Sequence, residues 1–281
     1  MTKANILITG ASTGIGAACA KKFIQEGYAV YGSVRKPGDA GRLSKELGEN
    51  FHPLLFDVTD ELAIQKSAAD LTNELNGAGL ELLINNAGIA VTGAVELLDL
   101  DAYRKQYEVN YFGLIAVTKA FLPLLGAQDN CPFKPGKIIN MSSIASKRTM
   151  PFMTPYAGSK AAVDSFTEGL RRELLVYGID AVTINPGPIQ TPIWDKIDVN
   201  MDKVEGTVYE PILKRFIKLV DKESKDAIDA DDFAHRVFKT FRSNRPKVSD
   251  VVIKNKFVKY HLLSLVPARR VDRFIKKILK I

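Results

Sequence analysis

The alternation of strand-length apolar runs with helically spaced apolar residues constrains the fold of this chain most. Short apolar runs are typical of buried strands, and apolar residues every three or four positions mark one face of a helix. Strands are expected at 5–9, 29–34, 52–56, 80–84, 137–141 and 179–184, and helices at 16–27, 60–75, 101–125 and 156–177. Such alternation predicts an α/β fold in which helices cover both faces of a doubly wound parallel sheet. We expect one domain over residues 1–255.

A glycine-rich turn joins the first strand to the first helix. Glycines allow a tight turn and a close approach to a pyrophosphate, and the helix N-terminus offers free N–H groups. A glycine turn alone could be a simple connection, but here the strand before it and the helix after it are both expected. We predict a Rossmann-type dinucleotide site whose turn residues contact the cofactor: Gly10, Ser12, Thr13, Gly14, Ile15 and Gly16.

Four polar residues fall at positions that suit proton transfer. Tyr156 and Lys160 are one helical turn apart, so they share a face. Ser143 precedes Tyr156 by thirteen positions at the end of an expected strand, and Asn110 lies in the long expected helix. A nearby cation lowers the pKa of a tyrosine, which is ordinarily about 10. We predict Tyr156 as a catalytic acid and base, Lys160 as its cation, and Ser143 as the hydrogen-bond partner of the substrate oxygen.

These motifs occur in an order that resembles the short-chain dehydrogenase/reductase family. They are the turn Thr9–Gly16 (TGxxxGxG), the sequence Asn85-Asn86-Ala87-Gly88, Ser143 with Tyr156-x-x-x-Lys160, and Asn185-Pro186-Gly187. The resemblance covers about residues 5–253. It implies an oxidoreductase that moves a hydride between a nicotinamide and a carbonyl or alcohol carbon. Ser142 would compete with Ser143, but its spacing to Tyr156 is one residue too long for the family.

The resemblance also implies roles for individual residues. Lys160 would hold the nicotinamide ribose, and Asn110 would keep a water that links Lys160 to solvent, although a helix-interior asparagine can also simply bond the backbone. Asn86, Ala87 and Gly88 would line the cofactor, or form only a stiff polar turn, or do both. Asp57 and Val58 would lie against the adenine. The loop over the nicotinamide would contain Pro186, Gly187, Ile189 and Thr191.

The end of the second strand bears on the choice of nicotinamide. NAD-preferring dinucleotide folds usually place an acid there to bond the ribose 2′-hydroxyl. Val34 occupies that position, and Arg35 and Lys36 follow it. Arg35, together with the hydroxyls of Ser12 and Ser33, would favour a 2′-phosphate, because a guanidinium matches phosphate geometry. We predict NADP(H) in preference to NAD(H); a solvated basic loop is the alternative.

Residues 188–225 contain scattered apolar side chains and no strand pattern. They predict a lid which, with Met150, Phe152 and Trp194, forms an apolar pocket. A lipophilic carbonyl or alcohol of steroid, retinoid or acyl type is the expected substrate. The same residues could instead pack the lid on the domain. A non-catalytic NADP-sensing or scaffold protein is the alternative function.

Basic charge is concentrated at the C-terminus. From His235 to Ile281 there are 14 Lys and Arg residues and two acids, whereas the residues before His235 carry 25 basic and 30 acidic groups. This local charge argues against a nucleic-acid binder. Residues 256–281 form a basic amphipathic extension that could pack on its own domain, on a second subunit or on an anionic membrane.

The remaining expectations concern cysteines, assembly and location. Cys19 and Cys131 fit no metal-ligand or redox spacing, so we expect reduced thiols and no metal site. We expect neither a signal peptide nor an apolar run of about 18 residues that could span a bilayer. The resemblance implies a homodimer or homotetramer assembled through the helices at 101–125 and 156–177, although the C-terminal extension could block one such surface. A cytoplasmic location is predicted, with peripheral membrane contact left open.

Overall fold

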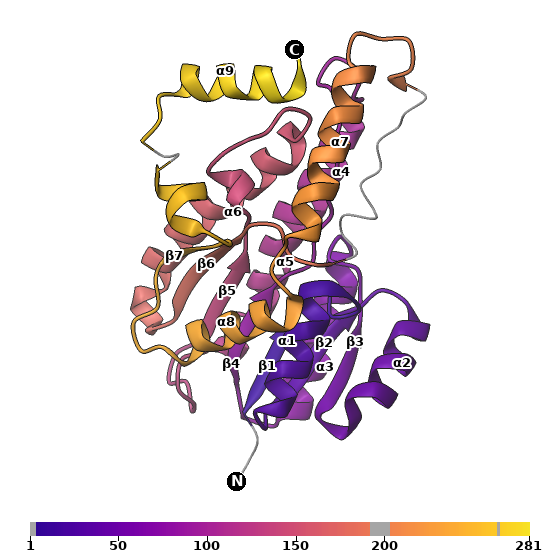
Figure 1. Ribbon diagram of the computed structural model, residues 1–281. Helices are drawn as coiled ribbons and strands as arrows, with labels where there is room; N and C mark the ends of the chain where they lie inside the picture. Colours follow the sequence, from indigo (N-terminus) through magenta and orange to yellow (C-terminus); the bar gives the residue numbers. More distant parts are fainter. Residues whose placement is uncertain (1–3, 192–202, 263–264) are drawn as a thin grey trace.

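A single parallel sheet forms the centre of the computed structural model, which describes residues 4–191, 203–262 and 265–281. Its strand order is β3-β2-β1-β4-β5-β6-β7, and every neighbouring pair is parallel (Figure 1). The strands are β1 (Asn5–Ile8), β2 (Ala29–Val34), β3 (Phe51–Leu55), β4 (Leu80–Asn85), β5 (Lys137–Met141), β6 (Asp180–Pro186) and β7 (Ser249–Val252). The predicted doubly wound fold is confirmed.

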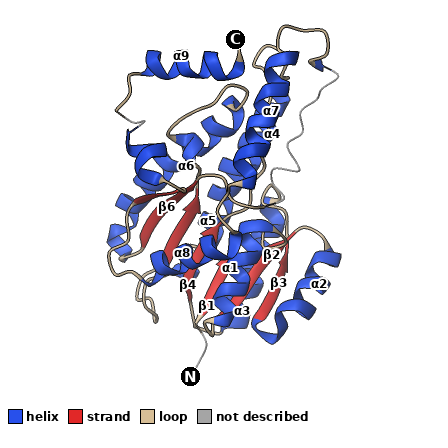
Figure 2. Cartoon of the chain, in the orientation of Figure 1, coloured by secondary structure: helices blue, strands red, loops and turns tan. Residues whose placement is uncertain are grey.

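Helices cover both faces of the sheet (Figure 2). On one face lie α1 (Gly14–Gln25), α2 (Pro37–Leu47) and α8 (Ala230–Arg242), and on the other lie α3 (Glu61–Leu75), α5 (Gly113–Phe121) and α6 (Thr154–Glu173). Alternate residues of β1 point to opposite faces: Ile6 and Ile8 pack with α1 and α8, and Leu7 packs with α3 and α5. Both apolar cores are therefore built from period-two strands.

The sequence expectation missed α2 and α8 and was wrong about a third helix. Helix α2 was not predicted, although Pro37 begins it and its apolar residues have helical spacing. The single helix expected at 101–125 consists of α4 (Leu100–Tyr107), a π-helical turn at Glu108–Phe112 and then α5. A π-turn adds a backbone residue without changing the apolar spacing on either side, so the sequence pattern did not reveal it.

Two further helices lie beyond the carboxyl-terminal edge of the sheet. Helix α7 (Glu210–Lys225) stands above the sheet, and α9 (Ala268–Leu279) crosses at the top of the view in Figure 1. They meet in a third apolar cluster, where Leu213 and Phe216 of α7 pack with Leu279 of α9. Arg215 donates a hydrogen bond from Nη1 to the carbonyl of Leu279 at 2.9 Å, which caps the C-terminus of α9. None of the described helices combines the length and the apolar character needed to cross a membrane.

The strand order reverses between β1 and β4. Strand β1 pairs with β2 on one side and with β4 on the other, so the connections leaving β1 and β4 run to opposite sides. In open α/β sheets, ligands bind in the crevice at the carboxyl ends of strands at such a reversal. Each motif that the sequence singled out lies on this edge.

Candidate active site

The glycine turn between β1 and α1 has a backbone that side chains would not tolerate. Gly10 and Gly14 have φ values of +67° and +58°. A Cβ at Gly16 would lie 2.2 Å from the carbonyl oxygen of Gly10. Thr13, the N-cap of α1, makes no side-chain capping bond, and the first turn has no acidic residue. The turn therefore offers N–H groups and no repelling charge, which fits the pyrophosphate of a dinucleotide.

The turn Asn85–Gly88 is bonded directly to the glycine turn. The hydroxyl of Thr9 accepts hydrogen bonds from the N–H groups of Asn86 (2.9 Å) and Ala87 (3.0 Å). Asn86 Nδ2 donates to the carbonyls of Thr9 (2.9 Å) and Gly10 (3.2 Å). Asn85 points into the sheet, where Nδ2 bonds Asn140 Oδ1 at 2.9 Å. This turn holds the carboxyl ends of β1 and β4 together.

The residues at the ends of β2 and β3 are of two kinds: some support the glycine turn or the core, and others are exposed. Ser33 is buried, and its hydroxyl accepts a hydrogen bond from the N–H of Gly10 at 3.0 Å. Because Ser33 is the acceptor in this bond, its O–H can still donate, and its contact with a phosphate stays a prediction. Arg35 is 67% exposed and lies 3.7 Å from Asp57. Val58 is buried and packs on Gly113, so its side chain belongs to the core.

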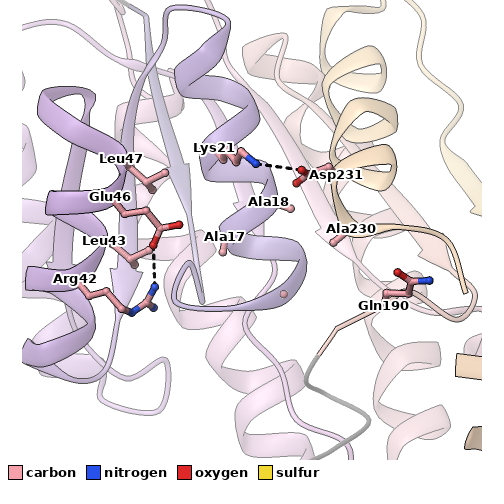
Figure 3. Close-up of a pocket in the computed structure, with 11 residues that line it drawn as sticks. Ala17, Ala18, Lys21, Arg42, Leu43, Glu46, Leu47, Gln190, Ala230 and Asp231 are labelled. Atoms are coloured by element: carbon pink, nitrogen blue, oxygen red, sulfur yellow. Dashed lines mark hydrogen bonds and ion pairs between the residues drawn. The ribbon is translucent and has the colours of Figure 1, made fainter. Parts of the chain in front are cut away.

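A groove beside the glycine turn contains a residue that the sequence analysis missed. Gly14 and Ala17 line it from α1, Arg42 lines it from α2, and Gln190 and Asp231 close the other side (Figure 3). Arg42 Nη2 donates to the carbonyl of Ser12 at 2.8 Å. The signal available was the helical spacing of Ala40, Leu43 and Leu47, which would have placed Arg42 beside the turn.

Helix α6 and the end of β5 bring the predicted catalytic residues together. Ser143 and Tyr156 share a side-chain hydrogen bond. Lys160 Nζ donates to the carbonyl of Met141 at 2.8 Å and lies 6.0 Å from the ring centroid of Tyr156. The Ser142 hydroxyl donates to the backbone carbonyl of Lys160 at 3.1 Å. The two serines therefore differ: Ser143 contacts the tyrosine hydroxyl, and Ser142 fastens α6 to β5.

Burial controls the protonation of this group. It raises the pKa of Tyr156, and the hydrogen bond with Ser143 lowers it in part. Burial lowers the pKa of Lys160 to about 8, and the nearby Asp164 carboxylate opposes that shift. Burial is the largest effect on the Tyr156 pKa in this structure, in which the Lys160 ammonium donates to Met141; lowering of the tyrosine pKa by Lys160 stays a prediction.

Asn110 lies in the π-turn and joins the loop after β4 to helix α6. Its Oδ1 accepts from the N–H of Ile89 at 2.8 Å, and its Nδ2 donates to the carbonyl of Ile89 at 3.0 Å and to Ser159 Oγ at 3.2 Å. A Cβ at Gly88 would lie 3.2 Å from Asn110 Oδ1 and 3.7 Å from Lys160 Nζ, so these three residues meet. The amide bonds the backbone of another segment rather than its own helix.

Two further buried amides support the site, and the sequence analysis assigned a role to neither. Gln106 accepts from the N–H of Val91 at 2.6 Å and lies one turn before Asn110, which was the available signal. Asn185 Nδ2 donates to Asp164 Oδ1 at 3.0 Å and to Ser146 Oγ at 3.1 Å. It thereby fixes the loop that carries Ser143.

The loop after β6 follows the same edge. The N–H of Gly187, the residue after Pro186, donates to the carbonyl of Val252 at 2.8 Å, and a Cβ at Gly187 would lie 2.7 Å from Ile253. Ile189 is buried and forms a β-bridge with Ile228. Thr191 is the last residue described before position 203.

The predicted substrate residues Met150 and Phe152 lie in the third apolar cluster, together with Tyr156. Phe152 has a φ of +68°, and its ring packs 5.5 Å from that of Phe216 on α7. Phe152 therefore packs on the lid helix, and its contact with a substrate stays a prediction. Trp194 lies outside the described residues. Among residues 4–191, 203–262 and 265–281, no cluster of His, Cys, Asp or Glu could hold a metal ion.

Comparison with known proteins agrees with this geometry. A family model described as short chain dehydrogenase matches residues 4–202. The chain is 37% identical over 274 residues to an NADPH-dependent 3-dehydrocapnine reductase of Ornithobacterium rhinotracheale, covering 98% of this chain and 96% of that protein. It is 31% identical to a 3-ketodihydrosphingosine reductase of Bacteroides thetaiotaomicron, covering 79% and 77% of the two chains.

A solved structure shares the fold. A short-chain dehydrogenase from Streptomyces avermitilis superposes with a TM-score of 0.77 at 23% identity, covering 100% of this chain and 98% of that one. The family match extends over well over half of the chain, and a relative above 30% identity spans nearly all of it. The chain therefore belongs to the short-chain dehydrogenase family, and it is an NAD(P)-dependent oxidoreductase of CH–OH and C=O groups.

Proposed function

We propose that this protein is an NADPH-dependent reductase of a lipophilic ketone. The observation that carries the proposal is the meeting of Ser143, Tyr156 and Lys160 at the sheet edge that holds the glycine turn. A proton donor and a dinucleotide-binding turn lie on the same carboxyl-terminal edge of the sheet. This suits hydride transfer, because the reaction needs the cofactor and the proton donor at one carbonyl group.

Each residue has a part in the proposed reaction. Bound NADPH supplies the hydride that the carbonyl carbon accepts. Ser143 donates a hydrogen bond to the carbonyl oxygen and aims it at Tyr156, whose hydroxyl gives up the proton that completes the alcohol. Lys160 keeps a positive charge near the phenolate that remains. Asn110 holds the loop after β4 against α6, where it would keep the water that returns a proton by way of Lys160. In the oxidative direction Tyr156 takes the proton back.

Arg35 is the proposed determinant for NADPH. Its guanidinium is exposed at the end of β2, where NAD-preferring folds carry an acid. The relative from Ornithobacterium rhinotracheale is itself named NADPH-dependent. Arg42, which contacts the carbonyl of Ser12, holds the turn from the same side. Arg35→Ala should weaken NADPH binding by about tenfold or more and leave NADH binding unchanged.

The apolar cluster beside Tyr156 supports a lipophilic substrate. Met150 and Phe152 lie in it, and α7 adds Leu213 and Phe216. These side chains place apolar groups next to Tyr156, which suits a ketone with a hydrocarbon body. The names of the two relatives, both reductases, are consistent with a carbonyl substrate.

The direct test combines binding with turnover. Purified protein is titrated with NADPH and NADH while nicotinamide fluorescence is followed, and lipophilic ketones are then added to the NADPH complex. We expect tighter NADPH binding, oxidation by at least one ketone, and loss of turnover with retained binding in Tyr156→Phe. Tighter NADH binding would contradict the role of Arg35, and turnover by Tyr156→Phe would contradict the mechanism. Binding without turnover on a broad panel would instead identify a cofactor-sensing protein.

Assembly through α4, α5 and α6 is also proposed. Exposed apolar side chains lie on or next to these helices, including Leu100, Phe112 and Leu175. Helix α9 packs on α7, so it leaves these surfaces uncovered. Light scattering should report a dimer or tetramer, and Phe112→Arg should lower the mass; a monomer in wild-type protein would exclude this arrangement.

A further inference from the structure

Helix α9 uses only half of its apolar face to pack on the protein. Val271, Ile275 and Leu279 recur every four residues and turn inward, and Leu279 is fully buried. Ile275 and Leu279 belong to the apolar cluster that contains Tyr156 and the α7 residues. The bond from Arg215 to the carbonyl of Leu279 fixes the end of the helix. This inner stripe explains why α9 stays on the lid.

A second apolar stripe, which we call the outer stripe, points away from the domain. It consists of Phe274, Ile278 and Ile281, which are 60%, 41% and 53% exposed. Helical spacing places Phe274 and Ile278 next to the inner stripe on the same side of α9, and Ile281 follows directly after the helix end at Lys280. Packing on the chain's own domain, one of the three alternatives that the sequence left open, accounts for the inner stripe and not for the outer one.

Positive charge surrounds the outer stripe. From Ala268 to Ile281 there are six Lys and Arg residues and one acid, Asp272. Arg270 lies four residues before Phe274, and Lys277 lies four residues before Ile281, so both cations border the stripe. A second copy of the chain would bring the same cations onto this surface in a two-fold contact, where they would repel one another. An anionic surface has the complementary charge.

We propose that the outer stripe of α9 inserts into the surface of an anionic lipid bilayer. A basic amphipathic helix lies in the plane of such a surface, with its apolar residues among the acyl chains and its cations at the headgroups. The inner stripe and Tyr156 belong to one apolar cluster, which connects the proposed bilayer surface to the reaction site. Resting on the proposed function, the inference further assigns the substrate to the ketones that reside in a bilayer.

Co-sedimentation of the full chain with lipid vesicles tests whether the outer stripe binds an anionic bilayer. Wild-type protein should bind phosphatidylcholine vesicles containing phosphatidylglycerol at least tenfold more tightly than phosphatidylcholine alone, and salt should weaken the binding. The double variant Phe274→Ser with Ile278→Ser should lose that binding. Its matched control is Leu62→Ser with Val248→Ser, which removes apolar side chains that are 79% and 56% exposed elsewhere. Thermal unfolding verifies that both double variants fold.

Charge is tested separately. Arg270→Gln with Lys277→Gln should weaken binding to the anionic vesicles several-fold, whereas Lys66→Gln with Lys134→Gln, at exposed lysines elsewhere, should not. Equal binding to both vesicle types, or equal binding by the stripe variant and wild type, would overturn the proposal. A dimer that the stripe variant converts to a monomer, with no loss of vesicle binding, would show that a second copy covers the stripe and would overturn it as well.

Activity assays separate this inference from the proposed function. With a water-soluble ketone, the Phe274→Ser, Ile278→Ser variant should reduce substrate at the wild-type rate. With a ketone dissolved in anionic vesicles, the variant should be at least tenfold slower. Equal rates in vesicles would refute delivery from the bilayer. Absence of turnover on every ketone would refute the proposed reductase, while the sedimentation result would still decide the membrane surface.

Discussion

Two adjacent serines follow β5 and have different partners. Ser143 bonds the tyrosine hydroxyl, and Ser142 bonds the backbone of Lys160 at 3.1 Å. Ser143→Ala should lower kcat by about 10² or more with little change in stability. Ser142→Ala should cost about 1–2 kcal/mol of unfolding free energy and keep kcat within a few-fold. Steady-state kinetics and urea unfolding measure both, and a reversal of the two effects would assign the substrate contact to Ser142.

The pH dependence follows from Lys160. Its pKa of about 8 means that the ammonium is present below that pH and lost above it. The pKa of Tyr156 is raised above its ordinary value, so the tyrosine stays protonated over this range. The kcat/KM for the nucleotide in the reductive direction should therefore fall as the pH rises through about 8. Asp164→Asn should move the fall to lower pH, because the carboxylate raises the lysine pKa; a flat profile to pH 9.5 would contradict this assignment.

At the scale of residues, helical spacing predicted which side chains form the catalytic group. It did not predict which other polar residues support that group or what they contact. Tyr156 and Lys160 share a face because helical periodicity places them there. Ser33, Arg42 and Asn185 depend instead on which segments meet in space. A single sequence does not contain that information, because their partners lie 21 to 30 residues away along the chain.

At the scale of elements, the glycine turn gives the sharpest test. A Cβ at Gly16 would lie 2.2 Å from the carbonyl oxygen of Gly10 and 2.6 Å from Asn86 Nδ2, so Gly16→Ala must open the turn. We expect loss of NADPH binding and a stability loss of about 2 kcal/mol or more. Gly41→Ala, inside α2 with nothing within 4 Å of its Cβ, should instead stabilise the protein by about 0.5–1 kcal/mol. Calorimetry and fluorescence titration distinguish these outcomes.

The strands were easier to predict than the helices that connect them. Six apolar runs gave six of the strands within one or two residues, because a strand buried on both faces is continuously apolar. Strand β7 carries the buried Asp250, which interrupts its apolar run. The π-turn that holds Asn110 is invisible in the spacing of Leu114, Val117 and Phe121, since the core face resumes after it.

At the scale of the molecule, one ion cluster connects helix α8, the edge strand β7 and the start of the C-terminal extension. Asp250 on β7 is buried, and it accepts two hydrogen bonds from Arg236 of α8, at 2.8 and 2.6 Å, and one from Lys256 at 3.3 Å. Arg236→Met should cost about 3 kcal/mol, because the carboxylate keeps only Lys256. Lys225→Met removes an exposed pair with Asp221 and should change stability by less than about 0.5 kcal/mol. Urea unfolding compares the two, and similar midpoints would show that the cluster adds little.

The strand order also governs how the sheet can grow while the chain is being synthesised. Strand β2 joins β1, β3 joins β2, β4 joins the other side of β1, and β5 to β7 follow outward in turn. No strand must be inserted between two that are already paired, so the sheet can extend in the order in which the ribosome releases it. The β1 edge that later meets β4 stays open while more than 70 residues emerge. During that interval the edge exposes unpaired backbone groups with which another extended segment could pair.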